Sequence, residues 1–99
     1  MRLELGPAAE AEVREAYQYY WKVDKSAAAR FMVSLDETIA RISRLPTMSP
    51  TYLFGTHRLL RRRFPFAVIY RVDVERIVVV AVAHQKRRPG YWRHRDPTP

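Results

Sequence analysis

The sequence predicts an α+β domain in which an antiparallel helix hairpin packs on one face of a small antiparallel β-sheet. Three features of the 99-residue chain support this fold. The first half holds two long segments with apolar residues at helical spacing, the second half holds three runs rich in β-branched residues, and a short alternating segment precedes them all. The expected order is β-α-α-β-β-β, and the length allows one domain, residues 1–99.

A first strand is expected over residues 2–5, because Leu3 and Leu5 alternate with polar neighbours. Pro7 suits the first turn of a helix, since its fixed backbone angle is already helical and its missing N–H would have no partner there. The predicted helix covers residues 7–22, and its apolar face consists of Val13, Ala16, Tyr17 and Tyr20.

A second helix is expected over residues 25–45. Either Asp24 or Ser26 can cap its N-terminus, and Pro46 ends it. A connector of about three residues turns the chain back on itself, so the two helices form an antiparallel pair. The apolar stripe of this helix consists of Ala28, Phe31, Leu35, Ile39, Ile42 and Leu45.

Three strands follow a predicted loop over residues 47–55. Their expected ranges are 56–63, 66–72 and 76–84, with a bend at Phe64-Pro65, because proline cannot donate to a central ladder. The run IVVVAV in the last strand suits a strand that is covered at least in part on both faces. Residues 85–99 form a basic tail, and its first part, residues 85–89, is expected to leave the sheet.

The positive charge of the chain lies in its second half. Residues 1–50 carry seven Lys/Arg and seven Asp/Glu, whereas residues 51–99 carry eleven and three, which accounts for the whole formal net charge of +8. We expect these cations to gather on the sheet, where a positive field attracts nucleic acid, an acidic protein, or both.

Several classes of protein are disfavoured by what the sequence lacks. There is no cysteine, no Gly-rich phosphate loop and no serine in a nucleophile-elbow context, and the histidines do not share metal-ligand spacing with carboxylates. No cofactor and no metal are therefore expected. The start resembles no signal peptide and the longest apolar run is too short to span a bilayer, so we expect a soluble, cytoplasmic protein with no membrane partner.

The run Arg61-Arg62-Arg63 is placed on the first of the three strands, where Arg61 and Arg63 would share one side and Arg62 would take the other. Because the helices need one side, some of these side chains must extend past the helix edge to reach solvent. They form either a solvated edge that aids solubility or a contact surface for phosphate or carboxylate groups.

Two further features lie at and after the end of the last strand. Tyr91 and Trp92 stand beside basic residues, and they either fold back onto the sheet or act as stacking or anchoring residues for bases or for a protein. His84 ends the last strand, where a packed or capping role is more common than a catalytic one.

The segments FPFAVIYRV and IVVVAVAHQKRRPGYW, in this order of elements, resemble the RelE/ParE superfamily of bacterial type II toxins, over about Leu3 to Arg95. The resemblance implies an antitoxin partner with an acidic or amphipathic segment that wraps the toxin, and a target inside the cell.

The superfamily divides by target. RelE-like members enter the ribosome and cut mRNA with basic side chains on the middle strands, and the resemblance places Leu60 and Ala67 at those positions. Arg87 falls near the arginine that follows the last strand, and Tyr91 lies close to the terminal tyrosine. If the chain is a ribosome-dependent endonuclease, the candidate residues are Arg61, Arg63, His84, Arg87 and Tyr91. An arginine is a poor general base, since it stays protonated.

ParE-like members inhibit DNA gyrase and need no catalytic set, so the resemblance favours this branch. The residues expected to contact the target are then Arg87, Arg88, Tyr91, Trp92, Arg58 and Arg62. A third possibility is a non-toxic module that binds nucleic acid or protein.

Overall fold

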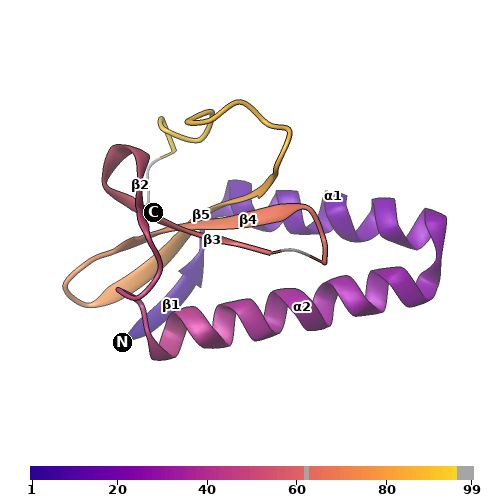
Figure 1. Cartoon of the computed structure of the whole chain (residues 1–99), viewed down its shortest axis with the longest axis horizontal. Coiled ribbons are helices and arrows are strands. Elements are labelled where there is room, and N and C mark those ends of the chain that lie inside the picture. Colours follow the sequence, from indigo (N-terminus) through magenta and orange to yellow (C-terminus); the bar gives the residue numbers. More distant parts are fainter. Residues whose placement is uncertain (62, 96–99) are drawn as a thin grey trace.

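The computed structural model describes residues 1–61 and 63–95. Its helices and strands are segregated as expected for an α+β chain, with two helices between the first strand and the rest of the sheet (Figure 1). In chain order they are β1 (Arg2–Leu5), α1 (Pro7–Val23), α2 (Lys25–Arg44), β2 (Thr51–Tyr52), the 3₁₀ turn η1 (Leu53–Gly55), β3 (Thr56–Leu60), β4 (Phe66–Val72) and β5 (Arg76–His84).

The helices begin and end where local chemistry dictates. Pro7 stands in the first turn of α1, and only Asp24 separates α1 from α2. The Asp24 side chain accepts a hydrogen bond of 3.0 Å from the backbone N–H of Ser26, so Asp24 is the cap of α2. The two helices consequently run antiparallel and side by side, as Figure 1 shows.

The sheet has five strands in the order β1-β5-β4-β3-β2. All neighbouring pairs are antiparallel, as expected, except β1 and β5, which pair in parallel, so the predicted antiparallel sheet needs one correction, at this edge. Two further expectations need correction. The segment 47–55 contains β2 and η1 instead of being only a loop, and β3 ends at Leu60, three residues before the predicted end.

Helices α1 and α2 cover one face of the sheet. Phe31 of α2 lies at the centre of an aromatic group, with ring centroids 5.2 Å from Tyr20, 5.8 Å from Phe64 and 5.2 Å from Phe66. Both phenylalanines of the FPF segment therefore belong to the core on this face. Such edge-to-face packing adds to the hydrophobic burial of the rings.

The opposite face of the sheet is covered by the C-terminal segment. Trp92 is only 1% exposed and packs with Ile69, Val78 and Val80 in a second, smaller core. Of the two alternatives for Trp92 that the sequence leaves open, folding back onto the sheet is the one that the structure shows. The ring of Trp92 also lies 6.0 Å from that of Tyr52, so the tail is joined to the far strand of the sheet.

A β-bulge in β5 adjusts which residues face this second core. Ile69 pairs with Ala81 and Tyr70 pairs with Val79, so Val80 is an extra residue without a partner on β4. After the bulge the alternation of faces is shifted by one residue, and Ala81 and Ala83 join the second core together with Val80. The bulge thus presents small side chains to the tail.

Candidate functional site

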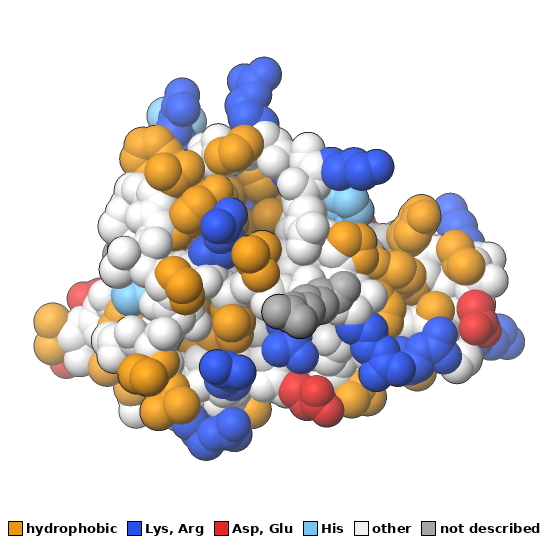
Figure 2. Space-filling model, viewed as in Figure 1, with side chains coloured by type: hydrophobic (Ala, Val, Ile, Leu, Met, Phe, Trp, Pro, Cys, Tyr) orange, Lys and Arg blue, Asp and Glu red, His pale blue; other side chains and the backbone are white. Residues whose placement is uncertain are grey.

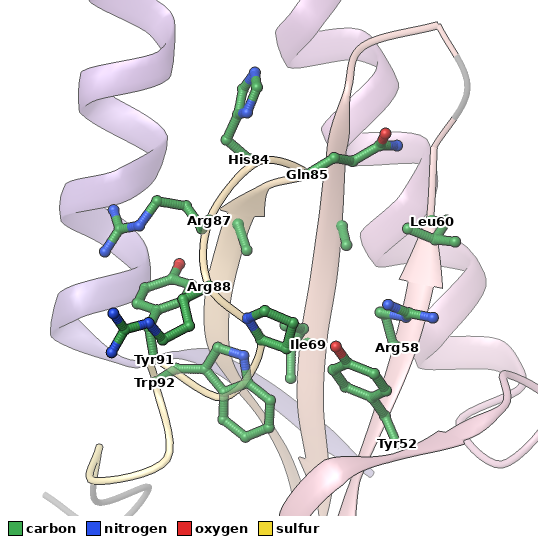
Figure 3. Close-up of a pocket in the computed structure, with 13 residues that line it drawn as sticks. Tyr52, Arg58, Leu60, Ile69, His84, Gln85, Arg87, Arg88, Tyr91 and Trp92 are labelled. Carbon is green, nitrogen blue, oxygen red and sulfur yellow. The ribbon is translucent and has the colours of Figure 1, made fainter.

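A pocket of about 270 Å³ lies on the sheet face away from the helices, between strands β3–β5 and the C-terminal segment. Figure 3 shows Arg87, Arg88 and Tyr91 on one side of it and Tyr52, Arg58 and Leu60 on the other. The complete lining consists of Tyr52, Arg58, Leu60, Ala67, Ile69, Ala83, His84, Gln85, Arg87, Arg88, Pro89, Tyr91 and Trp92.

The sheet contributes apolar side chains to the pocket. Leu60 of β3 and Ala67 of β4 are cross-strand partners, and Ile69 and Ala83 lie beside them. Leu60 is 49% exposed, which is high for a leucine that faces a pocket. This part of the pocket supplies neither a proton acceptor nor a cation.

The rim of the pocket is cationic, and two of its guanidinium groups rest on aromatic rings. Arg58 lies over Tyr52 at 4.0 Å from the ring centroid, and Arg87 lies over Tyr91 at 3.9 Å. Arg88 is exposed beside them. His84 is held at the strand end, where its Nδ1 accepts a hydrogen bond of 3.1 Å from the backbone N–H of Lys86, which agrees with a capping role.

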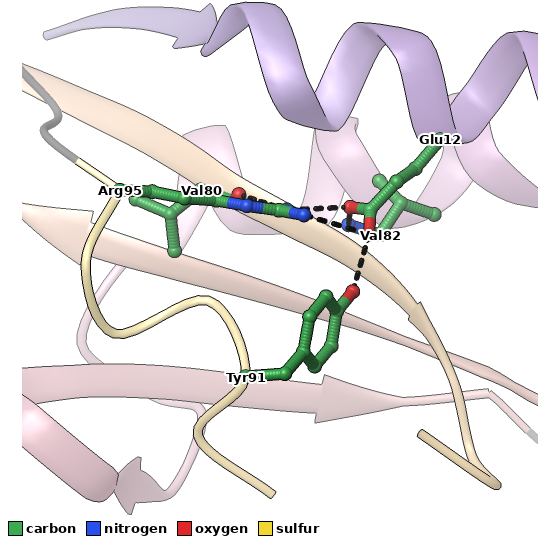
Figure 4. Close-up of polar contacts among 5 residues, drawn as sticks. All are labelled: Glu12, Val80, Val82, Tyr91 and Arg95. Carbon is green, nitrogen blue, oxygen red and sulfur yellow. Dashed lines mark hydrogen bonds and ion pairs between the residues drawn. The ribbon is translucent and has the colours of Figure 1, made fainter. Parts of the chain in front are cut away.

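The C-terminal segment is fastened to α1 through Glu12 (Figure 4). One carboxylate oxygen of Glu12 accepts from Arg95 at 2.8 Å, and the other accepts from the Tyr91 hydroxyl. Burial, and then the hydrogen bond to Glu12, raise the pKa of Tyr91 well above its usual range. Burial by itself would lower the pKa of Arg95, but the hydrogen bond and charge of Glu12 raise it. We call these three residues the Glu12 clasp.

The Glu12 clasp also completes the edge of the sheet. Strand β1 pairs with β5 only as far as Val79, so the backbone of β5 beyond that point lacks a neighbouring strand on this side. The Glu12 carboxylate accepts from the N–H of Val82 at 3.0 Å, and Arg95 donates to the carbonyl of Val80 at 2.9 Å. Side chains thus satisfy backbone groups that another strand would otherwise pair with.

A second groove, of about 540 Å³, runs between α1 and the end of β5. Tyr20, Phe31 and Phe66 supply apolar surface, while His84 and Arg87 contribute to its lining as well as to that of the pocket. Within residues 1–61 and 63–95 no helix is long and apolar enough to cross a membrane, and no cluster of three potential metal ligands occurs.

Comparison with known proteins identifies the family. The family described as "ParE toxin of type II toxin-antitoxin system, parDE" matches residues 3–89. The chain belongs to this family. A solved structure described as "Chromosomal ParDE TA system from P. aeruginosa" has a similar fold, with a TM-score of 0.65 at 18% identity, covering 85% of this chain and 95% of that chain. No curated protein matches the sequence significantly.

The predicted placement of the chain within the RelE/ParE superfamily, on the ParE-like side, is confirmed by this match. The match ends at residue 89, so Tyr91, Trp92 and Arg95 lie beyond the part that resembles the family. The α+β fold predicted from the sequence is confirmed as well, with the corrections to the strands given above.

The predicted site residues of this ParE-family chain divide into separate groups. Arg58, His84, Arg87, Arg88 and Tyr91 come together around the pocket. Trp92 lines the pocket but is buried, so the expectation that it anchors a partner as an exposed ring is wrong, and it instead folds back onto the sheet.

The remaining predicted arginines lie elsewhere. Arg61 and Arg63 come after the end of β3, so the predicted alternation of their faces does not apply, and they line a separate groove against α2 together with Arg30. Arg62 lies outside the described residues. The five nuclease candidates consequently do not form one groove.

The expectation of one cationic surface on the sheet is also wrong. Figure 2 shows Lys and Arg side chains spread over the visible face, in its middle as well as at its margins, with apolar side chains between them. Some cations are used internally, since Arg2 and Arg76 pair with Glu4 and Arg95 pairs with Glu12. The pocket rim is one of several basic regions.

The sequence interpretation missed Glu12, Tyr52 and Arg95. A signal for Glu12 exists, because it stands three residues after the buried Ala9 and four before Ala16, on the apolar side of α1. A carboxylate at such a position calls for a cationic or hydrogen-bonding partner. The identity of that partner, 83 residues further along, has no signal in the sequence.

Proposed function

We propose that this chain is the toxin subunit of a parDE-type pair, and that it inhibits DNA gyrase in the cytoplasm by binding and without a catalytic step of its own. Membership of the ParE toxin family supports the proposal. The single observation that carries the non-catalytic part is the apolar pair Leu60–Ala67 in the pocket. RNA cleavage by attack of a 2′-hydroxyl on the adjacent phosphodiester, with the 5′-oxygen as leaving group, requires a base and cationic stabilisation of the transition state, and this pair offers neither.

The other candidates for a general base are also unsuitable, which supports the proposal. The Tyr91 hydroxyl donates a hydrogen bond to Glu12, and its raised pKa disfavours the phenolate that a base would need. Nδ1 of His84 already accepts a backbone N–H. The arginines on the rim remain protonated and can serve only as cationic contacts.

The proposed function is tested with purified gyrase and relaxed plasmid. The full chain is expected to inhibit supercoiling in proportion to its concentration. A matched pair of variants isolates the pocket: Arg88→Gln should weaken inhibition about tenfold, since a charge-assisted contact is lost, whereas Arg14→Gln on the exposed side of α1 should not. Unaltered supercoiling, together with transcripts cut on translating ribosomes, would establish the endonuclease alternative instead.

The antitoxin is proposed to be acidic and to lie in the groove between α1 and β5. Its apolar side chains would contact Tyr20, Phe31 and Phe66, and its carboxylates would face Arg87 and His84. The net charge of +8 adds long-range attraction to such a partner. We expect affinity for the co-encoded antitoxin to fall as salt is raised, and a flat dependence in titration calorimetry would refute the electrostatic part.

A further inference from the structure

The pocket next to the Glu12 clasp has the chemistry of a site for protein side chains. We propose that it takes one apolar side chain flanked by carboxylates, presented by a segment of the target protein, and that it does not take an unstacked base. The identification of that target as gyrase rests on the proposed function, whereas the chemistry of the occupant rests on the contacts described below.

The aromatic rings around the pocket are already in use. Tyr52 is in contact with Arg58 at 4.0 Å and with Trp92 at 6.0 Å between centroids. Tyr91 is in contact with Arg87 at 3.9 Å and with Arg95 at 5.0 Å. Trp92 is buried. Recognition of single-stranded nucleic acid depends on exposed ring faces that can stack on bases, and these rings do not offer them.

The guanidinium groups, by contrast, are ready to receive anions. Stacking on a ring restrains Arg58 and Arg87, yet it leaves their in-plane N–H groups available for a carboxylate. Over residues 1–61 and 63–95, neither of them nor Arg88 makes an ion pair. Because Arg58 and Arg87 are held in place before binding, these side chains lose less conformational freedom when a partner binds.

The space between the cations is small and apolar. Leu60, Ala67, Ile69 and Ala83 line it, and about 270 Å³ suits a single side chain better than an extended ligand. The half-exposed Leu60 would bury much of its surface against such a side chain. An apolar centre with charges confined to the rim is the usual anatomy of a protein–protein contact.

The proposal is tested by NMR on the ¹⁵N-labelled full chain with two peptides and one nucleic acid. The first probe is a blocked Glu-Asp-Leu-Asp-Glu peptide, the second has Ser in place of Leu, and the third is a short single-stranded oligonucleotide of mixed sequence. The Leu peptide is expected to shift the amide signals of Arg58, Leu60 and Ala67 and to bind more tightly than the Ser peptide.

Variants of the full chain then locate the interaction. Arg58→Gln should weaken binding of the Leu peptide about tenfold, and Arg14→Gln should leave it unchanged. Leu60→Ser should remove the preference for Leu over Ser, while Leu53→Ser, an exposed leucine outside the pocket, should keep it. Equal binding of the two peptides, no shift at the pocket, or tighter binding of the oligonucleotide at the same amides would each overturn the proposal.

The supercoiling assay separates this proposal from the proposed function. If the Leu peptide binds in the pocket and gyrase is unaffected by the chain, the occupant's chemistry stands and the target is a different protein. If gyrase is inhibited equally by the parent chain, Arg58→Gln and Leu60→Ser, the target stands and the pocket is not the surface that binds it.

Discussion

The two faces of the sheet are held in different ways. On the helix side, Phe31, Phe64 and Phe66 form a continuous apolar core with α1 and α2. On the tail side, one buried tryptophan and the Glu12 clasp hold a segment that has no regular structure. Broad apolar burial makes the first face robust, whereas the second face, which carries the pocket, depends on a few specific contacts. The difference shows that one sheet can carry a broad apolar core on one face and a site built from a few polar contacts on the other.

The largest expected effect on the tail side comes from Trp92→Ala. Removal of a buried tryptophan should lower the free energy of unfolding by about 3–5 kcal/mol. Phe31→Ala is the matched change on the helix side, and it should lower the free energy of unfolding by a similar amount. The two differ in hydrogen exchange: Trp92→Ala should expose the tail and β2 first, and Phe31→Ala should lower protection throughout. Identical exchange patterns would contradict the distinction between the faces.

Glu12→Gln should have the next largest effect, because it leaves the partly buried Arg95 without its carboxylate partner. We expect the free energy of unfolding, measured by chemical denaturation, to fall by about 1.5–3 kcal/mol, the usual range for hydrogen bonds to charged groups. Glu15→Gln is the control, since Glu15 is exposed on the same helix and should change stability by less than about 0.5 kcal/mol. Equal effects of the two changes would show that the clasp contributes nothing.

Tyr91→Phe should remove a contribution to the free energy of unfolding that depends on pH in the alkaline range. The pKa of Tyr91 in the folded chain lies above its ordinary value of 10.0, so the folded chain holds this proton more tightly than the unfolded chain. The stabilisation is therefore complete below pH ~10 and declines as pH rises through the folded pKa. At neutral pH the free energy of unfolding of the parent chain should exceed that of Tyr91→Phe by about 1–2 kcal/mol. This difference should shrink above pH ~10. Tyr19→Phe, at an exposed ring, controls for the other tyrosines.

The smallest effect on stability is expected from replacing Arg87 and Arg88 together by Ala. Both side chains are exposed, and the stacking of Arg87 on Tyr91 contributes little to stability. The free energy of unfolding should therefore change by less than about 1 kcal/mol. Growth arrest on expression of the chain without antitoxin should nevertheless be relieved, because the pocket loses two of its cations. Undiminished arrest with a normally folded variant would remove this side of the rim from the mechanism.

Elements whose signals are local could be predicted from the sequence. The helices follow from apolar residues at helical spacing and from Asp24 and Pro46 at the ends of α2. Strands β4 and β5 follow from their β-branched runs. The end of β3 at Leu60 has no such local signal, because the strand is followed directly by arginines and neither proline nor glycine stands there to mark its end. The sequence names Arg58, Arg87, Arg88 and Tyr91 as candidates for target contact, but it does not indicate that they surround one pocket.

The α+β class and the helix hairpin follow from patterns that can be read locally along the chain, and the ParE-like resemblance follows from short segments taken in order, such as FPFAVIYRV and IVVVAVAHQKRRPGYW. The parallel pairing of β1 with β5, the closure of the second face by Trp92, and the contacts of Glu12 with Tyr91 and Arg95 appear only in the folded chain. These contacts join residues more than 70 positions apart in the cases of β1–β5 and the clasp. Their partners are selected by how the packed elements meet in space, which no local pattern of residue types encodes.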